Sequence, residues 1–180
     1  KNINSFRRDE ILSRFNFASP YVELPKKLTV RQNLEIYGRL YGIQKLSKRI
    51  EDISGDLDIK NFFNRKTGEL SSGQKNRVSL AKSLINKPEV LLLDEPTASL
   101  DPDIGDFIRG YIQDYKSKNK VTILLASHNM SEVERLCDSI IMMRQGRIID
   151  RGTCKDLIQK HGRNNLEETF LKLARSKNEF

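Results

Sequence analysis

Two kinds of apolar pattern alternate along this chain and predict its elements. Apolar side chains recur every three or four residues where helices are expected, and they form short continuous runs where buried strands are expected. Residues 90–93 are all apolar and too few for a helix, which is typical of a central parallel strand. Further buried strands are predicted at 121–126 and 139–143, and helices at 30–41, 46–57, 73–87, 102–115, 130–137, 153–160 and 166–174.

The ends of two predicted helices carry recognisable signals. Thr29 and Gln32 form a capping box, in which Thr29 caps the helix and Gln32 reaches back to it. Gly42 is expected to end that helix, because glycine is favoured just past a helix C-terminus. Pro102 stands at the first position of another helix, whose broad apolar face indicates that it packs on the sheet.

The helix predicted at 73–87 begins with small and polar residues, Ser71-Ser72-Gly73-Gln74. A helix start offers free backbone N–H groups and the positive end of a helix dipole, and here it also offers two hydroxyl groups. Gly73 would let a phosphate come close to the backbone. The pattern therefore predicts an anion site, although an ordinary serine-capped helix explains the same residues.

Polar side chains follow two of the predicted buried strands. Asp94 and Glu95 come directly after 90–93, and His128 closes the segment after 121–126. In open α/β sheets, ligands gather at the carboxyl ends of strands. One carboxylate there can hold Mg²⁺ through water, and the next can orient or deprotonate an attacking water. A lone histidine is often structural, but at this end of a strand it is well placed for chemistry.

Composition limits the classes of protein to which the chain can belong. Its 180 residues form one domain or part of one, and no apolar run approaches the roughly 20 residues of a transmembrane helix. The net charge of +8 permits contact with nucleic acid or anionic membranes, but the 32 basic and 24 acidic residues are interspersed, as on an ordinary solvated surface. Cys137 and Cys154 have no metal-binding spacing, so we expect a reduced, cytosolic chain.

The order of three motifs is more specific than any one of them. The chain reads LSSGQ at 70–74, LLLDEPTASLDP at 91–102 and SH at 127–128. This order and spacing resemble the ATP-binding cassette (ABC) ATPases. By this resemblance the site residues would be the signature residues Ser71, Ser72, Gly73 and Gln74, which bind nucleotide in trans, the Mg²⁺ carboxylate Asp94, the catalytic base Glu95, the D-loop residues Ser99 and Asp101, and the switch residue His128, which contacts the γ-phosphate.

The resemblance also implies a fold and its division. The expected fold is α/β, a partial P-loop NTPase-type ABC ATPase domain with a parallel sheet, flanking helices and an inserted α-helical subdomain. We expect a remnant of the ATP-binding core entering the Q-loop at 1–19 and the helical subdomain at 20–88. The RecA-like core with the catalytic carboxylates would span 89–152, and C-terminal helices would span 153–180.

Two parts of the family pattern have no match in this sequence. No G-x-x-x-x-G-K-[ST] phosphate-binding loop is found. We therefore expect the chain to be the C-terminal part of a longer protein and to be inactive by itself. The glutamine of the Q-loop would fall near Ser19 or Pro20, and neither is glutamine. Ser19 is the candidate to stand in for the missing amide.

The function implied by the resemblance is that of a subunit that hydrolyses ATP with Mg²⁺ and drives a separate polytopic membrane permease. Residues 19–34, SPYVELPKKLTVRQNL, resemble bacterial exporters and so favour export. We expect a homodimer at the cytoplasmic face of the plasma membrane, with no specific nucleic acid. Two alternatives stay open. One is a soluble ABC protein acting on ribosomes or DNA, which would bind nucleic acid in a salt-dependent way. The other is a regulatory fragment without ATPase activity of its own.

Overall fold

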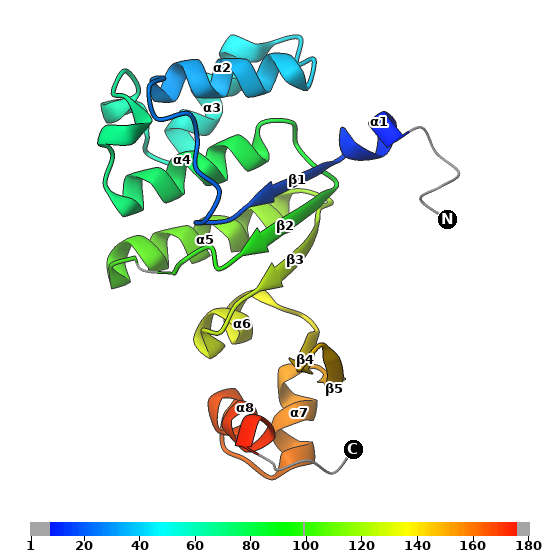
Figure 1. Cartoon of the computed structure of the whole chain (residues 1–180). Helices are drawn as coiled ribbons and strands as arrows, with labels where there is room; N and C mark the ends of the chain where they lie inside the picture. The colour runs from blue at the N-terminus through cyan, green and yellow to red at the C-terminus, as the bar shows by residue number, and fades with distance from the viewer. Residues whose placement is uncertain (1–7, 99, 176–180) are drawn as a thin grey trace. The chain divides into compact units, whose positions relative to one another are not determined.

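The computed structural model describes residues 8–98 and 100–175. The chain forms two compact units, Lys1–Ala126 and Ser127–Phe180. The first holds a three-stranded sheet and the helices α1 to α5, and the second holds a β-hairpin and the helices α6 to α8 (Figure 1). No helix in the described ranges is long and apolar enough to cross a membrane.

The first unit is built on a parallel sheet with the strand order β1-β2-β3. The strands are β1 (Phe15–Ala18), β2 (Val90–Asp94) and β3 (Thr122–Ala126). Ala18 pairs with Leu93, and Asp94 pairs with Ala126. Because this register ends the three strands at one edge, the segments that follow them lie together at the edge where α/β proteins bind ligands. A parallel sheet in an α/β fold was predicted, and the structure confirms it.

The central strand β2 is buried, as its apolar run predicted. Leu91 is 1 % exposed and Leu93 is 2 % exposed. The helix that follows it, α5 (Pro102–Lys118), has Pro102 in its first turn and buries Ile108 and Ile112. Burying each of these four side chains contributes roughly 1.5–3 kcal/mol to the stability of the fold. This burial holds the strand and the helix together.

The strand β3 lies where predicted, but the expectation that it is buried was wrong. Leu124, at its centre, is 63 % exposed. Within the described residues β3 pairs only with β2, so it forms an edge of the sheet. A short apolar run predicts a strand but does not say how many neighbours cover it.

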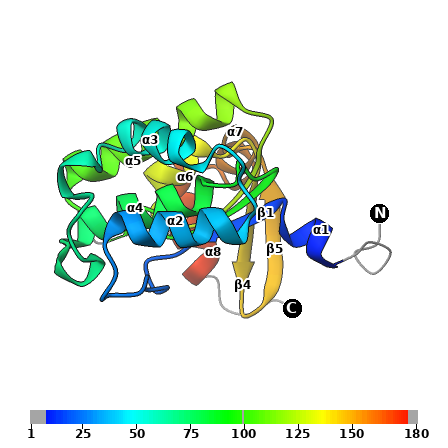
Figure 2. The same cartoon turned by 90° about the horizontal axis from the view of Figure 1, so that it is seen from above.

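Three helices of the first unit lie side by side and form a helical subdomain (Figure 1, Figure 2). They are α2 (Val30–Leu40), α3 (Leu46–Asp56) and α4 (Ser72–Leu84), with the 3₁₀ turns η2 (Lys60–Phe62) and η3 (Thr67–Glu69) between α3 and α4. A short helix, α1 (Arg8–Leu12), precedes β1. The subdomain has its own apolar core, whose fully buried members are Val30, Leu34, Ile53, Leu57, Ile59 and Val78.

The capping signals predicted for α2 are confirmed. The Gln32 amide donates to Thr29 Oγ1 over 3.1 Å, and the Thr29 amide donates to Gln32 Oε1 over 2.9 Å. Gly42 follows the helix with φ of 67°, a left-handed conformation that glycine adopts at low cost. The local sequence therefore sets both ends of this helix.

A polar seam attaches the end of α4 to strand β1. Asn16 Nδ2 donates to Asn86 Oδ1 over 2.9 Å, and the Lys82 ammonium donates to the Phe17 carbonyl over 2.8 Å. Burial lowers the pKa of Lys82, whose charge also lies 5.6 Å from the centre of the Tyr37 ring. These bonds hold the helical subdomain against the strand that leads into Ser19.

The second unit packs three helices around a β-hairpin. The elements are α6 (Met130–Leu136), β4 (Ile140–Arg144), β5 (Arg147–Gly152), α7 (Cys154–His161) and α8 (Leu166–Arg175). The strand predicted at 139–143 exists, and it pairs antiparallel with β5. Its side chains alternate between core and solvent, so Met142 is buried while Met143 is exposed.

The four-part division predicted from the sequence is not the division into compact units. The two units meet between Ala126 and Ser127, inside the stretch 89–152 that was expected to form one core. The second unit has a core cluster formed by Val133, Ile140, Met142, Leu157 and Leu166. The boundaries at 19, 88 and 152 stay predictions.

Candidate nucleotide-binding site

The edge at which β1 and β2 end brings two predicted site residues into contact. Ser19 follows β1, and its hydroxyl donates to Asp94 Oδ2 over 3.0 Å. The same hydroxyl oxygen accepts a hydrogen bond from the Tyr21 amide at 3.3 Å. Ser19 is 4 % exposed, so both of its bonds are formed inside the protein. The serine at the Q-loop position is therefore built into the carboxylate site.

Glu95 follows Asp94 in an unusual backbone conformation. Its φ of 47° lies in the left-handed region, which non-glycine residues seldom adopt. The Glu95 amide donates to the Ala126 carbonyl at the end of β3 over 2.8 Å, and the Glu95 carbonyl accepts from the Ala98 amide at 3.1 Å. Residues held in this region are frequent at functional sites, because the surrounding structure must enforce the strain.

The residues at this edge suit a Mg²⁺ ion bound together with phosphates. Magnesium prefers oxygen ligands and is commonly held by one or two carboxylates, with water and phosphate oxygens completing its shell. Asp94 supplies a half-buried carboxylate, and the Ser19 hydroxyl adds a neighbouring oxygen. In the described part of the chain no group of three or more histidine, cysteine or acidic side chains could form a metal site by itself. The donor set therefore fits an ion that arrives with its nucleotide.

The signature residues form the start of α4. The Gln74 amide donates to Ser71 Oγ over 3.3 Å, and the Ser71 amide donates to Gln74 Oε1 over 3.1 Å. The serine cap was one of the two interpretations of these residues, but the return bond to Gln74 was not predicted, although Ser-x-x-Gln is the same kind of pattern as Thr29 and Gln32. The amides of Ser72 and Gly73 have no acceptor within the helix, because they lie in its first turn. Ser72 is exposed, so the helix start keeps donors for an anion.

Gly73 has a packing reason to be glycine besides the predicted approach of a phosphate. It is buried, and a methyl group in its place would lie 2.7 Å from Ile104 Cδ1 of α5. That distance is shorter than ordinary van der Waals contact. Glycine at this position therefore lets α4 and α5 come close together, and close phosphate approach stays a prediction.

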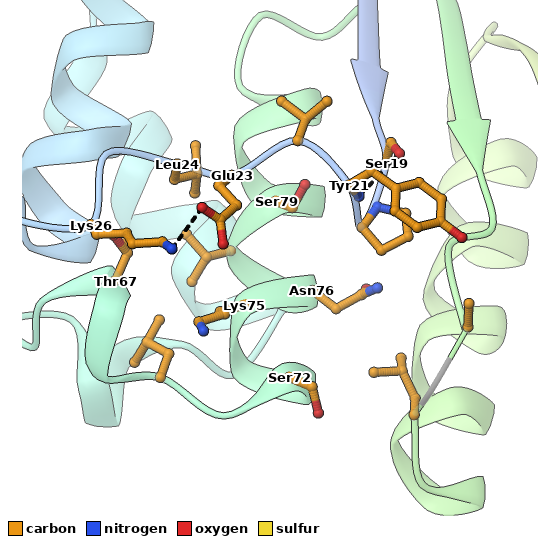
Figure 3. Close-up of a pocket in the computed structure, with 16 residues that line it drawn as sticks. Ser19, Tyr21, Glu23, Leu24, Lys26, Thr67, Ser72, Lys75, Asn76 and Ser79 are labelled. Carbon is orange, nitrogen blue, oxygen red and sulfur yellow. Dashed lines mark hydrogen bonds and ion pairs between the residues drawn. The ribbon is translucent and has the colours of Figure 1, made fainter.

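The signature helix and the Q-loop segment form opposite walls of one cavity. The cavity has a volume of about 350 Å³ and lies between residues 19–26 and the first turns of α4 (Figure 3). Ser19 and Ser72 both line it, and the Glu23–Lys26 ion pair of 2.8 Å closes one side. Pro20 also lines it. The predicted Q-loop residues and one signature residue, Ser72, therefore line the same cavity of the first unit.

The structure does not test three of the predicted site residues. Asp101 is exposed and caps α5 without a side-chain hydrogen bond to the helix. Ser99 lies outside the described residues. His128 belongs to the second compact unit. The roles of Ser99, Asp101 and His128 stay predictions.

One residue that lies in the site was missed. Asn76 of α4 donates through Nδ2 to the Pro96 carbonyl over 2.7 Å, next to Glu95. The sequence contained only a weak indication that Asn76 belongs to the site. Asparagine is a poor residue for a helix interior, and such a choice indicates that its side chain has a partner elsewhere.

The family is decided by comparison with known proteins. Residues 2–98 match the family model described as ABC transporter. This chain belongs to the ABC transporter family. The match covers β1, the helical subdomain, β2 and the Asp94–Glu95 pair, so the resemblance based on motif order is confirmed.

Three relatives show the range of the family around this chain. The ABC transporter ATP-binding protein NatA of Bacillus subtilis is 39 % identical over 152 residues, which are 83 % of this chain and 61 % of NatA. The methionine import ATP-binding protein MetN 1 of Bacillus anthracis is 41 % identical over 139 residues, 74 % of this chain and 39 % of MetN 1. The Nod factor export ATP-binding protein I of Rhizobium sp. strain N33 is 36 % identical over 140 residues, 77 % of this chain and 46 % of that protein.

The chain spans less than two thirds of the length of these relatives.

One solved structure is described as the ATP binding subunit of an ABC transporter. It matches this chain with a TM-score of 0.81 at 23 % identity, and the match covers 94 % of this chain and 74 % of the chain in that structure. This likeness confirms the ABC ATPase fold. It does not extend to substrates or partners.

Proposed function

We propose that the whole protein binds and hydrolyses ATP and thereby drives a separate membrane permease. The observation that carries this proposal is the group formed by Ser19, Asp94 and Glu95 at the carboxyl ends of β1 and β2. Membership of the ABC transporter family supports it.

Each residue of the group has a distinct task in this proposal. Asp94 and the Ser19 hydroxyl would hold Mg²⁺, which supplies charge neutralisation at the β- and γ-phosphates. Glu95 accepts a proton from the attacking water, and its fixed backbone keeps the carboxylate at the sheet edge. His128 contacts the γ-phosphate as the resemblance implies.

The helix start of α4 serves a second nucleotide. In our proposal Ser71, Ser72, Gly73 and Gln74 bind the phosphates held by another subunit, and the D-loop residues Ser99 and Asp101 lie at the same subunit interface. The exposed Ser72 hydroxyl and the backbone amides of the first turn would donate hydrogen bonds to those phosphates. Two copies of the protein would then enclose two nucleotides and act from the cytoplasmic face of the membrane on a polytopic permease.

We propose export as the direction of transport. The relatives include both directions, since the methionine import protein aligns with 74 % of this chain at 41 % identity and the Nod factor export protein with 77 % at 36 % identity. The exporter-like segment at 19–34 is what supports export. Metabolite profiling of cells that lack the protein tests it. Retention of a compound inside those cells is expected, and its depletion from cells together with persistence in the medium would indicate import.

The ATPase itself is tested in the full-length protein with two substitutions and one control. Glu95→Gln should keep ATP binding and slow hydrolysis by roughly 10²–10⁴-fold, because the amide keeps the shape but cannot accept a proton. Asp94→Asn should weaken the Mg²⁺ dependence of binding measured by calorimetry. Glu89→Gln alters an exposed carboxylate at the other end of β2, paired with Arg14 at 2.8 Å, and should change neither. Near-normal hydrolysis by Glu95→Gln would show that Glu95 is not the base.

A further inference from the structure

One face of α4 follows the segment that joins β2 to α5. Gly73, Asn76 and Leu80 are spaced three and four residues apart, so they lie on the same side of the helix. Gly73 packs against Ile104 in the first turns of α5. Asn76 binds the Pro96 carbonyl at 2.7 Å. This face of α4 therefore contacts Pro96, near the start of the segment 95–101, and Ile104, three residues after its end.

The contacts around Asn76 are close to the carboxylate site. A small cavity of about 10 Å³ is enclosed by Ser19, Asn76, Leu80, Asp94 and Pro96, among others. Asn76 and Asp94 therefore line the same small space. Leu80 is 2 % exposed and forms its apolar wall. A change in the position of Asn76 would therefore be felt by the neighbouring Asp94 and by the turn that carries Glu95.

Backbone hydrogen bonds join the segment 95–101 to β3, through the Glu95 amide and the Ala126 carbonyl, and also close turns within the segment. The Ala98 amide donates to the Glu95 carbonyl at 3.1 Å, and the Leu100 amide donates to the Thr97 carbonyl at 3.4 Å. Both are turn bonds within the segment, so they do not attach it to the helical subdomain. The Asn76 side chain supplies that attachment at Pro96, one residue after the left-handed turn at Glu95.

We propose that Asn76 is a positioning residue for hydrolysis. It fastens the signature end of α4 to the turn that carries Glu95, so that the helix start and the base keep a fixed separation. In the proposed function the helix start serves one nucleotide and Glu95 serves the other. The inference therefore rests on that function, and Asn76 itself touches neither nucleotide.

The choice of residue argues against a purely structural role for Asn76. Alanine forms helices more readily than asparagine, because the asparagine side chain competes for backbone hydrogen bonds. A substitution Asn76→Ala should therefore leave α4 at least as helical as before. Any loss of activity must then come from the lost bond to Pro96 and not from fraying of the helix.

The first test measures ATP hydrolysis by the full-length protein. Asn76→Ala should lower kcat by about three- to tenfold, the size expected for one lost hydrogen bond that aligns a reacting group. KM should change by less than about twofold, because the bond makes no contact with substrate. Asn76→Gln keeps an amide donor and should recover part of kcat. Ser83→Ala, about two turns along α4, removes a hydroxyl that donates to the Leu80 carbonyl within the same helix over 2.8 Å, and as the matched control it should behave as wild type.

The second test measures amide hydrogen exchange and does not need ATP. Asn76→Ala should speed exchange of the Ala98 amide by about three- to tenfold, since the turn loses its attachment, while Leu34 in α2 stays unchanged. An unchanged kcat in Asn76→Ala, equal losses in Asn76→Ala and Asn76→Gln, or unaltered exchange at Ala98 would each overturn the proposal. If the wild-type protein hydrolyses no ATP, the proposed function fails, and the exchange measurement still decides whether Asn76 fastens the turn.

Discussion

At the scale of single residues, Glu95 has a strained backbone conformation at a position where the site needs a carboxylate. Its left-handed φ of 47° costs a non-glycine residue roughly 1–2 kcal/mol. The bond from its amide to the Ala126 carbonyl and the bond to its carbonyl from Ala98 hold the turn in that form. Glycine would adopt the turn more easily, but it has no carboxylate. The strain therefore fits a position where an acidic side chain is needed.

The strain at Glu95 can be measured by comparing two substitutions. Glu95→Gly and Glu95→Ala both remove the carboxylate, so the difference between them reports mainly the backbone. We expect Glu95→Gly to be more stable than Glu95→Ala by about 1 kcal/mol in urea unfolding. Equal stabilities would mean that the turn relaxes when the side chain is lost.

In the second unit, Asp150 is a buried carboxylate with three donors. Lys160 Nζ lies 2.8 Å from Oδ1, His161 Nε2 lies 2.6 Å from Oδ2, and the Arg151 amide donates to Oδ1 over 2.8 Å. The hydrogen bond from Lys160, followed by that from His161, lowers the pKa of Asp150 to about 2. The group therefore ties β5 to the end of α7.

The pH dependence of stability should reveal this group. Because the pKa of Asp150 is lower in the folded state than in the unfolded state, its contribution is present above the unfolded value of about 4 and is lost as pH falls toward 2. The loss should be about 2 kcal/mol. Denaturant unfolding measured from about pH 5 to about pH 2 should show that the free energy of unfolding falls less steeply with falling pH for Asp150→Asn than for wild type. If the free energy of unfolding depended on pH in the same way in both proteins, Asp150 would not have the lowered pKa described here.

At the scale of elements, the packing of α2 on α3 depends on a glycine that the sequence did not explain. Gly38 is buried in α2, and a methyl group there would overlap the side chain of Leu46 at the start of α3. A glycine inside a helix is usually unfavourable, so a close neighbour is the physical reason for keeping it. The two helices can approach because this side chain is absent.

A double-mutant cycle tests that contact. Gly38→Ala alone should destabilise the protein by about 1–3 kcal/mol through overpacking, although alanine is the better helix former. In a Leu46→Ala background the same change should be neutral or stabilising by up to about 1 kcal/mol. The free energy of unfolding of the four proteins gives the coupling between the two positions. Additive effects would show that the helices have room to separate.

The elements themselves were largely predictable, because they depend on local sequence. The capping box at Thr29, the end of α2 at Gly42 and the start of α5 at Pro102 follow from neighbours a few residues apart. Features that depend on distant residues were not predictable. Gly73 against Ile104 and Asn76 with Pro96 join residues that are 20 or more positions apart in the chain. Their partners are set by packing, which a pattern of spacing does not encode.

At the scale of the whole chain, the sequence predicted where the strands lie better than it predicted how they pair. The apolar runs predicted strands at 90–93, 121–126 and 139–143, and all three exist. The runs did not reveal that β3 is an exposed edge in the described residues. The carboxylate site was predictable for a different reason. Residues after parallel strands meet at one edge whatever the details of packing, so Asp94 and Glu95 were expected at that edge.

The last prediction concerns assembly of the full-length protein. If the start of α4 binds the phosphates held by a second copy, ATP should join two subunits. Its helix dipole contributes roughly 0.3–1 kcal/mol to a nearby anion, and each hydrogen bond to a charged phosphate adds roughly 1.5–3 kcal/mol. ADP lacks the γ-phosphate and should not hold the pair. The Glu95→Gln protein should therefore dimerise with ATP and stay monomeric with ADP in sizing chromatography.

The substitution that breaks this dimer should be placed at Ser72. Gly73 is buried against Ile104, so a carboxylate there would disturb packing as well as binding. Ser72 is exposed in the first turn of α4, where an acidic side chain is favourable for the helix and occupies the anion site. In the Glu95→Gln background, Ser72→Asp should abolish the ATP dimer, while Ser72→Ala should retain it and both should bind ATP as monomers. A dimer that survives Ser72→Asp would mean that Ser71 and Gln74 serve only to cap the helix.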